Sequence, residues 1–243
     1  MKKKNKAIYL LFLMPFVYFA TACFVVWLVK TSGIYPSGSD TMYHVYRGDY
    51  VYNAIKSGNW YPLYDPAWYN GVEILRYWSP FPAYVMAFCQ YLAGGSQFGA
   101  YLFYIGGVCF LGACVWPFIG RGFNRPYLGA FIGLLWFFMP NNLCAIFIEG
   151  NLARSLSMIF LPVFIYSVYK YLYNHKLRYI PLMVFTFLLM ELCHLGYAGM
   201  VAIAVIIYGI VYIIQKGRKK AVLDVVISMI FGFMLLGIWL VAS

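Results

Sequence analysis

Long apolar stretches dominate the chain and are separated by shorter polar segments. These stretches occupy residues 7–29, 98–119, 127–148, 155–173, 179–195, 197–214 and 221–242. Most are close to the roughly 17–25 residues with which a helix crosses a bilayer core of about 30 Å. A transmembrane β-barrel requires alternating hydrophobicity instead, and runs such as AVIIYGIVYII do not alternate. The pattern predicts an all-α, polytopic transmembrane helical bundle.

The polar pattern changes in residues 30–97, which follow the first apolar run. This segment contains one short apolar piece at 81–94, between SPFP and GGSQ. About 14 residues make a helix of about 21 Å, which is shorter than the bilayer core. We therefore expect 81–94 to lie at the outer surface or to dip into it, with a short tilted crossing as the alternative.

The whole chain, 1–243, is expected to form a single membrane domain. It begins with a first transmembrane helix at 7–29 and continues with the long first extracytoplasmic loop at 30–97, which contains interfacial helices. Residues 98–243 supply the remaining helices, for about seven to eight crossings in total.

Basic residues gather at the ends of the apolar runs and set the expected orientation. The clusters are KKKNK (2–6), RGFNR (121–125), HKLR (175–178) and QKGRKK (215–220). If 81–94 does not cross, all four clusters lie on the cytoplasmic side, as the positive-inside rule requires. We therefore expect an integral protein of the cytoplasmic membrane with a cytoplasmic N-terminus.

Composition supports a membrane protein and argues against other classes. Hydrophobic residues make up 64% of the chain, above the roughly 45–50% of soluble domains. The net charge of +11 does not indicate nucleic-acid binding, because no soluble module offers a basic face. The six cysteines lie in or beside apolar runs without C-x-x-C spacing, which is typical of packing residues.

The acidic residues converge on one side of the expected topology. Of the seven, only one is placed on the inner side, namely Asp224. Five lie outside and a sixth, Glu191, lies about one helical turn below the outer surface. The outer five are Asp40, Asp49, Asp65, Glu73 and Glu149. Acidic residues do not follow the positive-inside bias, so their convergence indicates a site.

The stretch GSDTMYHVYRGDYVYNAIKSGNWYP, 38–62, carries the first candidate group. Asp40, His44 and Arg47 stand at i, i+4 and i+7, within one stripe of a helix. Ser37 and Ser39 are suited to cap its start. The alternative is an interfacial helix whose charged side chains are merely solvated.

The following residues combine aromatic and charged side chains. Trp60 and Tyr61 open an aromatic series that is interleaved with prolines, and Glu73 and Arg76 lie within it. A membrane-interface aromatic belt accounts for part of this series. Tryptophan and tyrosine faces also stack on sugar rings, and the charged groups are suited to hydroxyls or phosphates.

Two later outer turns carry further candidates. Glu149 and Arg154 share the turn EGNLAR, where a surface ion pair worth less than about 1 kcal/mol is the alternative to a role in binding. Glu191 and His194 lie at i and i+3 near the outer end of an apolar helix. Ionisable residues at membrane depth are functional candidates by default.

These motifs resemble the GT-C-fold membrane glycosyltransferases, in particular the bacterial branch of 6-pyruvoyl-tetrahydropterin-synthase-related or YfhO-like membrane proteins. The pterin-synthase wording implies no catalytic role here. The residues that carry the resemblance are GSD (38–40), His44, Arg47, IKSGNWYP (55–62), Asn70-Gly71, YWSPFPAY (77–84), MPNN (139–142), EGNLARSLS (149–157), His194 and Gly196.

The resemblance implies a transferase that uses a polyprenyl-phosphate-linked sugar at the outer face, with a cell-envelope acceptor and membrane lipid as partners. Asp40 matches the essential acidic position, and Thr41 stands where several relatives have a second carboxylate. The catalytic candidates are Asp40 and His44. The substrate-binding candidates are Arg47, Trp60, Tyr61, Glu73, Arg76, Glu149, Arg154 and His194. A divalent metal ion held by Asp40 with Glu73 or Glu149 is a further alternative.

Two other functions stay open at this point. A transporter or flippase for a lipid-linked substrate would place ionisable groups near the midplane, often in repeated halves, and the sequence shows no repeat. A non-catalytic membrane protein on the same scaffold is the other. GT-C enzymes usually run to several hundred residues, so the chain is also expected to be the N-terminal part of a longer protein or a minimal version.

Overall fold

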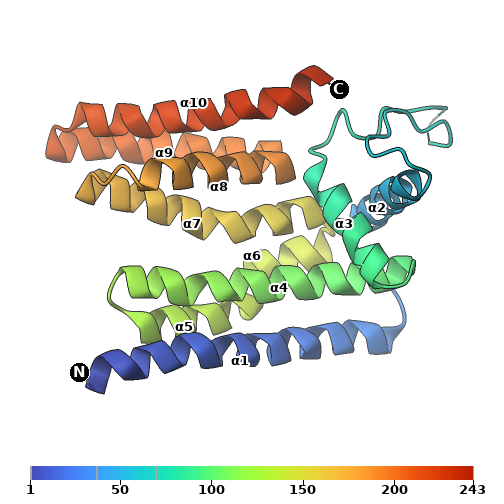
Figure 1. Cartoon of the computed structure of the whole chain (residues 1–243), viewed down its shortest axis with the longest axis horizontal. Coiled ribbons are helices and arrows are strands. Elements are labelled where there is room, and N and C mark those ends of the chain that lie inside the picture. Colours follow the sequence, from blue (N-terminus) through green and yellow to red (C-terminus); the bar gives the residue numbers. More distant parts are fainter. Residues whose placement is uncertain (1, 37, 69, 243) are drawn as a thin grey trace. The chain divides into compact units, whose positions relative to one another are not determined.

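A computed structural model describes residues 2–36, 38–68 and 70–242, with side chains described from residue 12 to residue 240 within these ranges. The described residues are helical apart from turns and one isolated β-bridge, between Asp65 and Val72 (Figure 1). The all-α fold class is therefore confirmed. The chain divides into two compact units, formed by the described residues of Met1–Pro62 with Phe81–Ile159, and of Leu63–Pro80 with Phe160–Ser243.

Helices account for most of both units. The first unit contains α1 (Lys2–Ser32), α2 (Thr41–Lys56), α3 (Phe81–Leu92), α4 (Gln97–Gly122), α5 (Pro126–Leu135), the 3-10 turn η1 (Trp136–Phe138), α6 (Pro140–Leu143) and the π-helical turn η2 (Cys144–Ile148). The second contains α8 (Tyr179–Cys193), α9 (Leu195–Lys216) and α10 (Lys219–Ala242), and α7 (Leu152–Asn174) contributes to both units.

Six helical segments among the described residues are long and apolar enough to cross a membrane. They are Phe12–Ser32, Gln97–Gly122, Pro126–Ile148, Leu152–Asn174, Leu195–Lys216 and Lys219–Leu240. The expected run at 179–195 forms the shorter apolar helix α8, of 15 residues. Helix α3 has only 12 residues, which agrees with the short apolar helix that the sequence predicts; its position at the membrane surface stays a prediction.

Helices α1, α4 and α5 lie side by side in the first unit (Figure 1). Tyr18 of α1 is fully buried, and its hydroxyl donates a hydrogen bond of 2.8 Å to the carbonyl of Ala130 in α5. Helix α4 begins where the side chain of Ser96 accepts a hydrogen bond of 3.0 Å from the Gly99 N–H, as an N-cap does.

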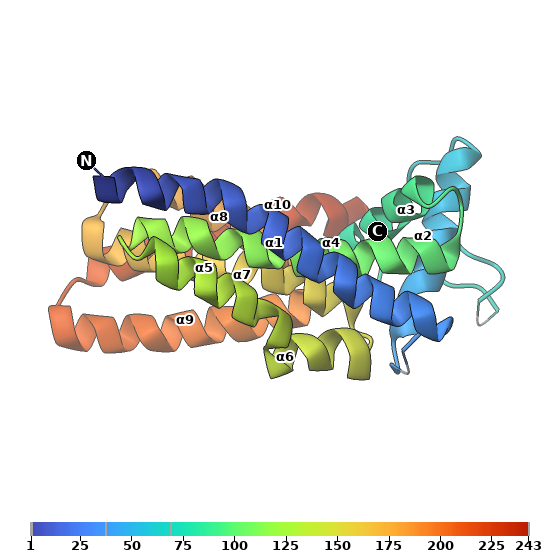
Figure 2. The same cartoon turned by 90° about the horizontal axis from the view of Figure 1, so that it is seen from below.

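The apolar run at 127–148 is not the uniform helix that the sequence predicts. It is interrupted between α5 and α6, and Figure 2 shows the change of direction at this point. Met139 takes an extended backbone conformation (φ −63°, ψ 123°) before Pro140, because a proline disfavours the helical conformation in the preceding residue. The Asn142 side chain donates a hydrogen bond of 2.8 Å to the carbonyl of Trp136 and so satisfies a backbone group that the break exposes.

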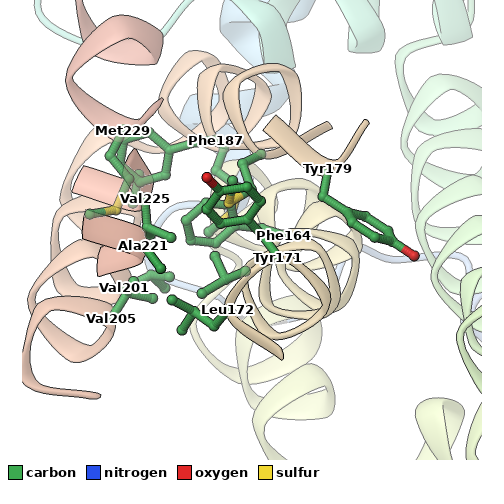
Figure 3. Close-up of a cluster of buried hydrophobic side chains, with 14 of the residues drawn as sticks. Phe164, Tyr171, Leu172, Tyr179, Phe187, Val201, Val205, Ala221, Val225 and Met229 are labelled. Carbon is green, nitrogen blue, oxygen red and sulfur yellow. The ribbon is translucent and has the colours of Figure 1, made fainter. Parts of the chain in front are cut away.

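The second unit has a core built from α7 to α10. Figure 3 shows its side chains converging from these helices, with Phe164 and Phe187 in contact at a ring-centroid distance of 5.2 Å. Lipid tails are as apolar as these side chains, so close packing and hydrogen bonds, rather than the hydrophobic effect, hold such helices together. One of these bonds joins the Tyr212 hydroxyl to the carbonyl of Leu172 at 2.5 Å.

The segment 63–80 is part of the second unit and is anchored to its helices. The indole N–H of Trp239 in α10 donates a hydrogen bond of 2.8 Å to the carbonyl of Leu75, which is buried. The Ser79 hydroxyl donates one of 2.7 Å to the carbonyl of Glu191 in α8. The segment therefore has a defined position on this unit although it contains no helix.

Candidate functional site

Asp40 stands at the N-cap position of α2 but does not use its side chain as a cap. Its backbone is helical (φ −106°, ψ −8°), and its carboxylate accepts no hydrogen bond from the first turn of the helix. Of the described residues, Ser39 alone donates to this carboxylate, through a hydroxyl 3.1 Å from Oδ1. The expected capping role of Ser39 is therefore wrong, and Ser37 lies outside the described residues. The Asp40 carboxylate keeps most of its capacity to accept protons or hydrogen bonds.

His44 and Arg47 lie on the buried face of α2. Arg47 is 1% exposed and His44 is 6% exposed, so the alternative of a solvated stripe is wrong for both. The Arg47 guanidinium lies 5.5 Å from the ring centre of Tyr43, within the range of a cation–π interaction. Burial lowers the pKa of Arg47, and the nearby hydroxyls of Tyr43 and Tyr104 oppose this shift.

The N-terminus of α2 rests directly on the turn that carries Glu149. The Asp40 N–H donates a hydrogen bond of 3.1 Å to the carbonyl of Glu149, and the Ser39 hydroxyl lies 3.2 Å from the same oxygen. Gly38 and Gly150 make the close approach possible, because a Cβ on Gly38 would lie 2.6 Å from the Cα of Gly150. Two segments more than 100 residues apart in the sequence thus fix the position of Asp40.

Glu149 and Arg154 form the ion pair that their spacing suggests. Arg154 Nη1 lies 2.7 Å from Glu149 Oε2, and the side chains are 19% and 37% exposed, respectively. Asn151 begins helix α7 by accepting a hydrogen bond of 2.9 Å from the Arg154 N–H. The turn therefore presents a carboxylate and a guanidinium on the same unit as Asp40.

Trp60 and Tyr61 follow α2 in the first unit. Trp60 is 71% exposed, and its carbonyl accepts a hydrogen bond of 2.7 Å from the Tyr84 hydroxyl. The hydroxyl of Tyr61 is buried, with no hydrogen-bond partner among the described residues, and burial raises its pKa. The pair thus offers one open aromatic face and one hydroxyl whose hydrogen-bonding capacity is unused within the described protein.

Glu73, Arg76 and His194 belong to the second unit. Glu73 and Arg76 pair with each other while their side chains stay 41% and 48% exposed. The hydrogen bond that Arg76 donates to the Glu73 carboxylate raises the pKa of Arg76. His194 accepts a hydrogen bond of 3.0 Å from the Tyr197 N–H through Nδ1 and so caps α9. The structure gives His194 a structural task that the sequence did not reveal.

The sequence reasoning missed how the first-unit site is held in place. Gly38, Ser39, Gly150 and Asn151 belong to the motifs GSD and EGNLARSLS, but nothing in the spacing of these motifs indicates that they contact each other. Asp49, which is off the Asp40 stripe, accepts a hydrogen bond of 2.6 Å from the Gln90 amide. Among the described residues, no group of three or more His, Cys, Asp or Glu side chains is arranged to hold a metal ion.

The first-unit site therefore combines a half-exposed carboxylate, a buried imidazole and guanidinium behind it, and an ion pair on the adjoining turn. An ionised carboxylate accepts protons, and guanidinium groups recognise phosphate oxygens. These groups are suited to a polar, phosphate-bearing substrate at the end of the helices.

The family model of the 6-pyruvoyl-tetrahydropterin synthase related domain, described as a membrane protein, matches residues 75–243. This range includes Arg76, Glu149, Arg154 and His194. It begins after the first-loop candidates from Asp40 to Glu73, which therefore lie outside the match. No curated protein and no solved structure matches the chain.

Proposed function

The chain belongs to the 6-pyruvoyl-tetrahydropterin synthase related family of membrane proteins, and from this starting point we propose that it is a membrane glycosyltransferase of the GT-C type. It transfers a sugar from a polyprenyl-phosphate donor to a cell-envelope acceptor. The six apolar helices place the protein in a membrane, where such a lipid-linked donor resides.

One observation carries the proposal, namely the position of Asp40. Its carboxylate stands at the start of α2 without capping the helix, and its backbone is fixed to the Glu149 turn by a 3.1 Å hydrogen bond. A carboxylate that the fold positions but does not use is available for chemistry.

The reaction needs one base and one group that holds phosphate. Asp40 accepts the proton of the acceptor hydroxyl while that oxygen bonds to the sugar C1. The C1–O bond to the phosphate breaks, and its electron pair leaves with the phosphate, so no acid is required. Arg154 is the candidate to bind the phosphate, because a guanidinium binds such oxygens with two parallel hydrogen bonds. His44 is buried on the Asp40 stripe and is proposed to position the base.

The orientation is part of the proposal. With the N-terminus and the basic clusters in the cytoplasm, Asp40 and the Glu149 turn face the outside of a bacterial cytoplasmic membrane. A requirement for a divalent metal ion is an additional proposal, and dialysis against a chelator would abolish transfer if the ion were required.

A transporter for lipid-linked substrates is the second candidate. It is favoured by the broken helix between α5 and η2, where Asn142 is buried at the break, since transporters bind substrates at such interruptions. A non-catalytic protein on the same scaffold is the remaining alternative.

The test uses the full chain in proteoliposomes with a polyprenyl-phosphate sugar donor. Asp40→Asn keeps the size of the side chain and removes the base, and we expect transfer to fall by about 10²–10⁴-fold. Asp49→Asn is the matched control in the same helix; its Oδ1 still accepts the hydrogen bond from Gln90, so transfer should persist. Equal activity of Asp40→Asn and the wild type would overturn the proposed base, and movement of the donor across the bilayer without transfer would favour the transporter.

A further inference from the structure

The second unit has a basic hollow at the end of its helices. None of the residues that line it is among the candidate catalytic or substrate-binding residues described above. The turns that join α7 to α8 and α9 to α10 form it, with a volume of about 540 Å³. The residues that matter for its chemistry are Tyr171, His175, Arg218, Lys219, Lys220 and Asp224. A volume of this size accommodates a phosphate group together with the small polar group that it esterifies.

The positive side chains of the hollow form no ion pair with the described residues. In the part of the chain that the structure describes, ion pairs form at Glu73–Arg76 and Glu149–Arg154 and involve none of Arg218, Lys219 and Lys220. Asp224 is the acidic residue of the hollow, and its Oδ2 accepts a hydrogen bond of 2.6 Å from the Tyr171 hydroxyl. Several positive charges held close together at an open cavity favour an anionic ligand.

A local contact holds Arg218 at the hollow, and ring contacts hold two neighbouring cations elsewhere. Arg218 Nη1 is in hydrogen-bonding contact with His175 Nε2, which holds the guanidinium across the two turns. Lys170 and Arg178 instead lie over the rings of Tyr166 and Tyr179, at 5.6 Å and 5.1 Å. The hollow therefore has its own set of charges, distinct from the other basic residues at this end of the helices.

The first turn of α10 adds to the positive potential. The helix starts at Lys219, so the backbone N–H groups of its first turn lie beside the same lysines. A helix N-terminus favours anions, and phosphate in particular. The helix is long, and its end coincides with the end of a membrane-crossing segment, Lys219–Leu240. When this segment crosses a membrane, the hollow lies at the depth of lipid headgroups.

We propose that this hollow binds a phosphate ester, with Arg218, Lys219 and Lys220 as its ligands. The phosphate belongs either to the headgroup of an anionic phospholipid or to a soluble phosphate compound. The chemistry is the same in both cases, and the proposal does not depend on the glycosyltransferase function.

The experiment measures binding to the full chain in nanodiscs of phosphatidylcholine. One arm adds graded amounts of phosphatidylglycerol to the bilayer, and the other adds inorganic phosphate to the buffer. A ligand that binds the folded state raises the thermal unfolding midpoint, because it stabilises that state by RT ln(1 + [L]/Kd), and the Kd is fitted from this dependence. A rise that fits this dependence in the first arm identifies a lipid headgroup, and one in the second arm identifies a soluble phosphate.

The decisive comparison is between two double variants with equal loss of charge. Arg218→Gln with Lys220→Gln alters the hollow, whereas Lys176→Gln with Lys216→Gln alters residues beside it that do not line it. Each cation near a phosphate is worth about fivefold in affinity, so the hollow variant should bind about 25-fold more weakly and the control should be close to the wild type.

Three results would overturn the proposal: an unfolding midpoint that does not rise in either arm, an equal loss in the two variants, or an unchanged affinity in the hollow variant. The substituted side chains are exposed, so the variants should fold, which circular dichroism verifies. If the double variant does not fold, the single Lys219→Gln variant decides, with an expected loss of about fivefold.

Discussion

The contact between Gly38 and Gly150 makes a quantitative prediction for Gly150→Ala. Gly150 has φ +69°, and a Cβ there would lie 2.1 Å from Thr41 Oγ1 and 2.7 Å from the Thr41 N. The added methyl group overlaps the backbone of α2, so the Glu149 turn and the start of α2 must separate. The hydrogen bond from the Asp40 N–H to the Glu149 carbonyl lies at this contact and is lost.

The expected cost has three parts. A non-glycine residue at positive φ costs about 1 kcal/mol, overpacking costs about 1–3 kcal/mol, and the lost hydrogen bond costs about 1 kcal/mol. The free energy of unfolding should therefore fall by about 3–5 kcal/mol.

Gly33→Ala is the matched control. Gly33 has nearly the same backbone angle, φ +68°, but nothing lies within 4 Å of a Cβ there. Gly33→Ala should therefore lose only the cost of a non-glycine residue at positive φ, about 1 kcal/mol of unfolding free energy. The remaining difference between the two variants, about 2–4 kcal/mol, measures the contact at Gly150.

The assay is equilibrium unfolding of both variants in mixed detergent micelles, followed by circular dichroism. If Gly150→Ala is no less stable than Gly33→Ala, the turn does not hold α2 as described. A second readout is transfer activity, which should decrease for Gly150→Ala under conditions in which the protein stays folded, because Asp40 is displaced.

Three further substitutions test other contacts. Trp239→Phe should lower the free energy of unfolding by about 1–3 kcal/mol, because the buried carbonyl of Leu75 loses its 2.8 Å donor; an unchanged value in micelle unfolding would contradict the anchoring of segment 63–80. Burial raises the pKa of Tyr84 from 10.0 to about 12, because the folded protein favours the neutral hydroxyl. The stability that this neutral hydroxyl contributes is therefore complete below pH 10 and is lost as the pH rises through 12. Tyr84→Phe should remove that part of the alkaline loss, measured as the wild-type minus variant difference in unfolding free energy. Tyr61→Phe should keep or raise stability by about 1 kcal/mol, because it deletes a buried hydroxyl without a partner among the described residues, yet lower transfer if that hydroxyl binds substrate; full activity would remove Tyr61 from the site.

The helices of the first unit illustrate how far the sequence pattern reaches. The runs at 7–29 and 98–119 correspond to α1 (Lys2–Ser32) and α4 (Gln97–Gly122), because an uninterrupted apolar stretch in a bilayer has to satisfy its backbone as a helix. The run at 127–148 was equally apolar but breaks at Met139, since apolarity gives no warning of where a proline diverts the chain.

The site was predictable in its residues but not in its arrangement. The spacing of Asp40, His44 and Arg47 indicated one helical stripe, and all three lie on or at the start of α2. That His44 and Arg47 are buried depends on what packs against this stripe, which periodicity does not specify.

The sequence alone determined that this is a helical membrane protein with a polar, aromatic first loop, because hydropathy, helix length and charge bias act locally along the chain. The tertiary structure decided which distant segments meet. The Asp40 position is fixed by a backbone hydrogen bond to Glu149 and a contact between two glycines, and backbone groups carry no residue-specific signal in a sequence. The basic hollow likewise exists because two separate turns fold side by side in the second unit.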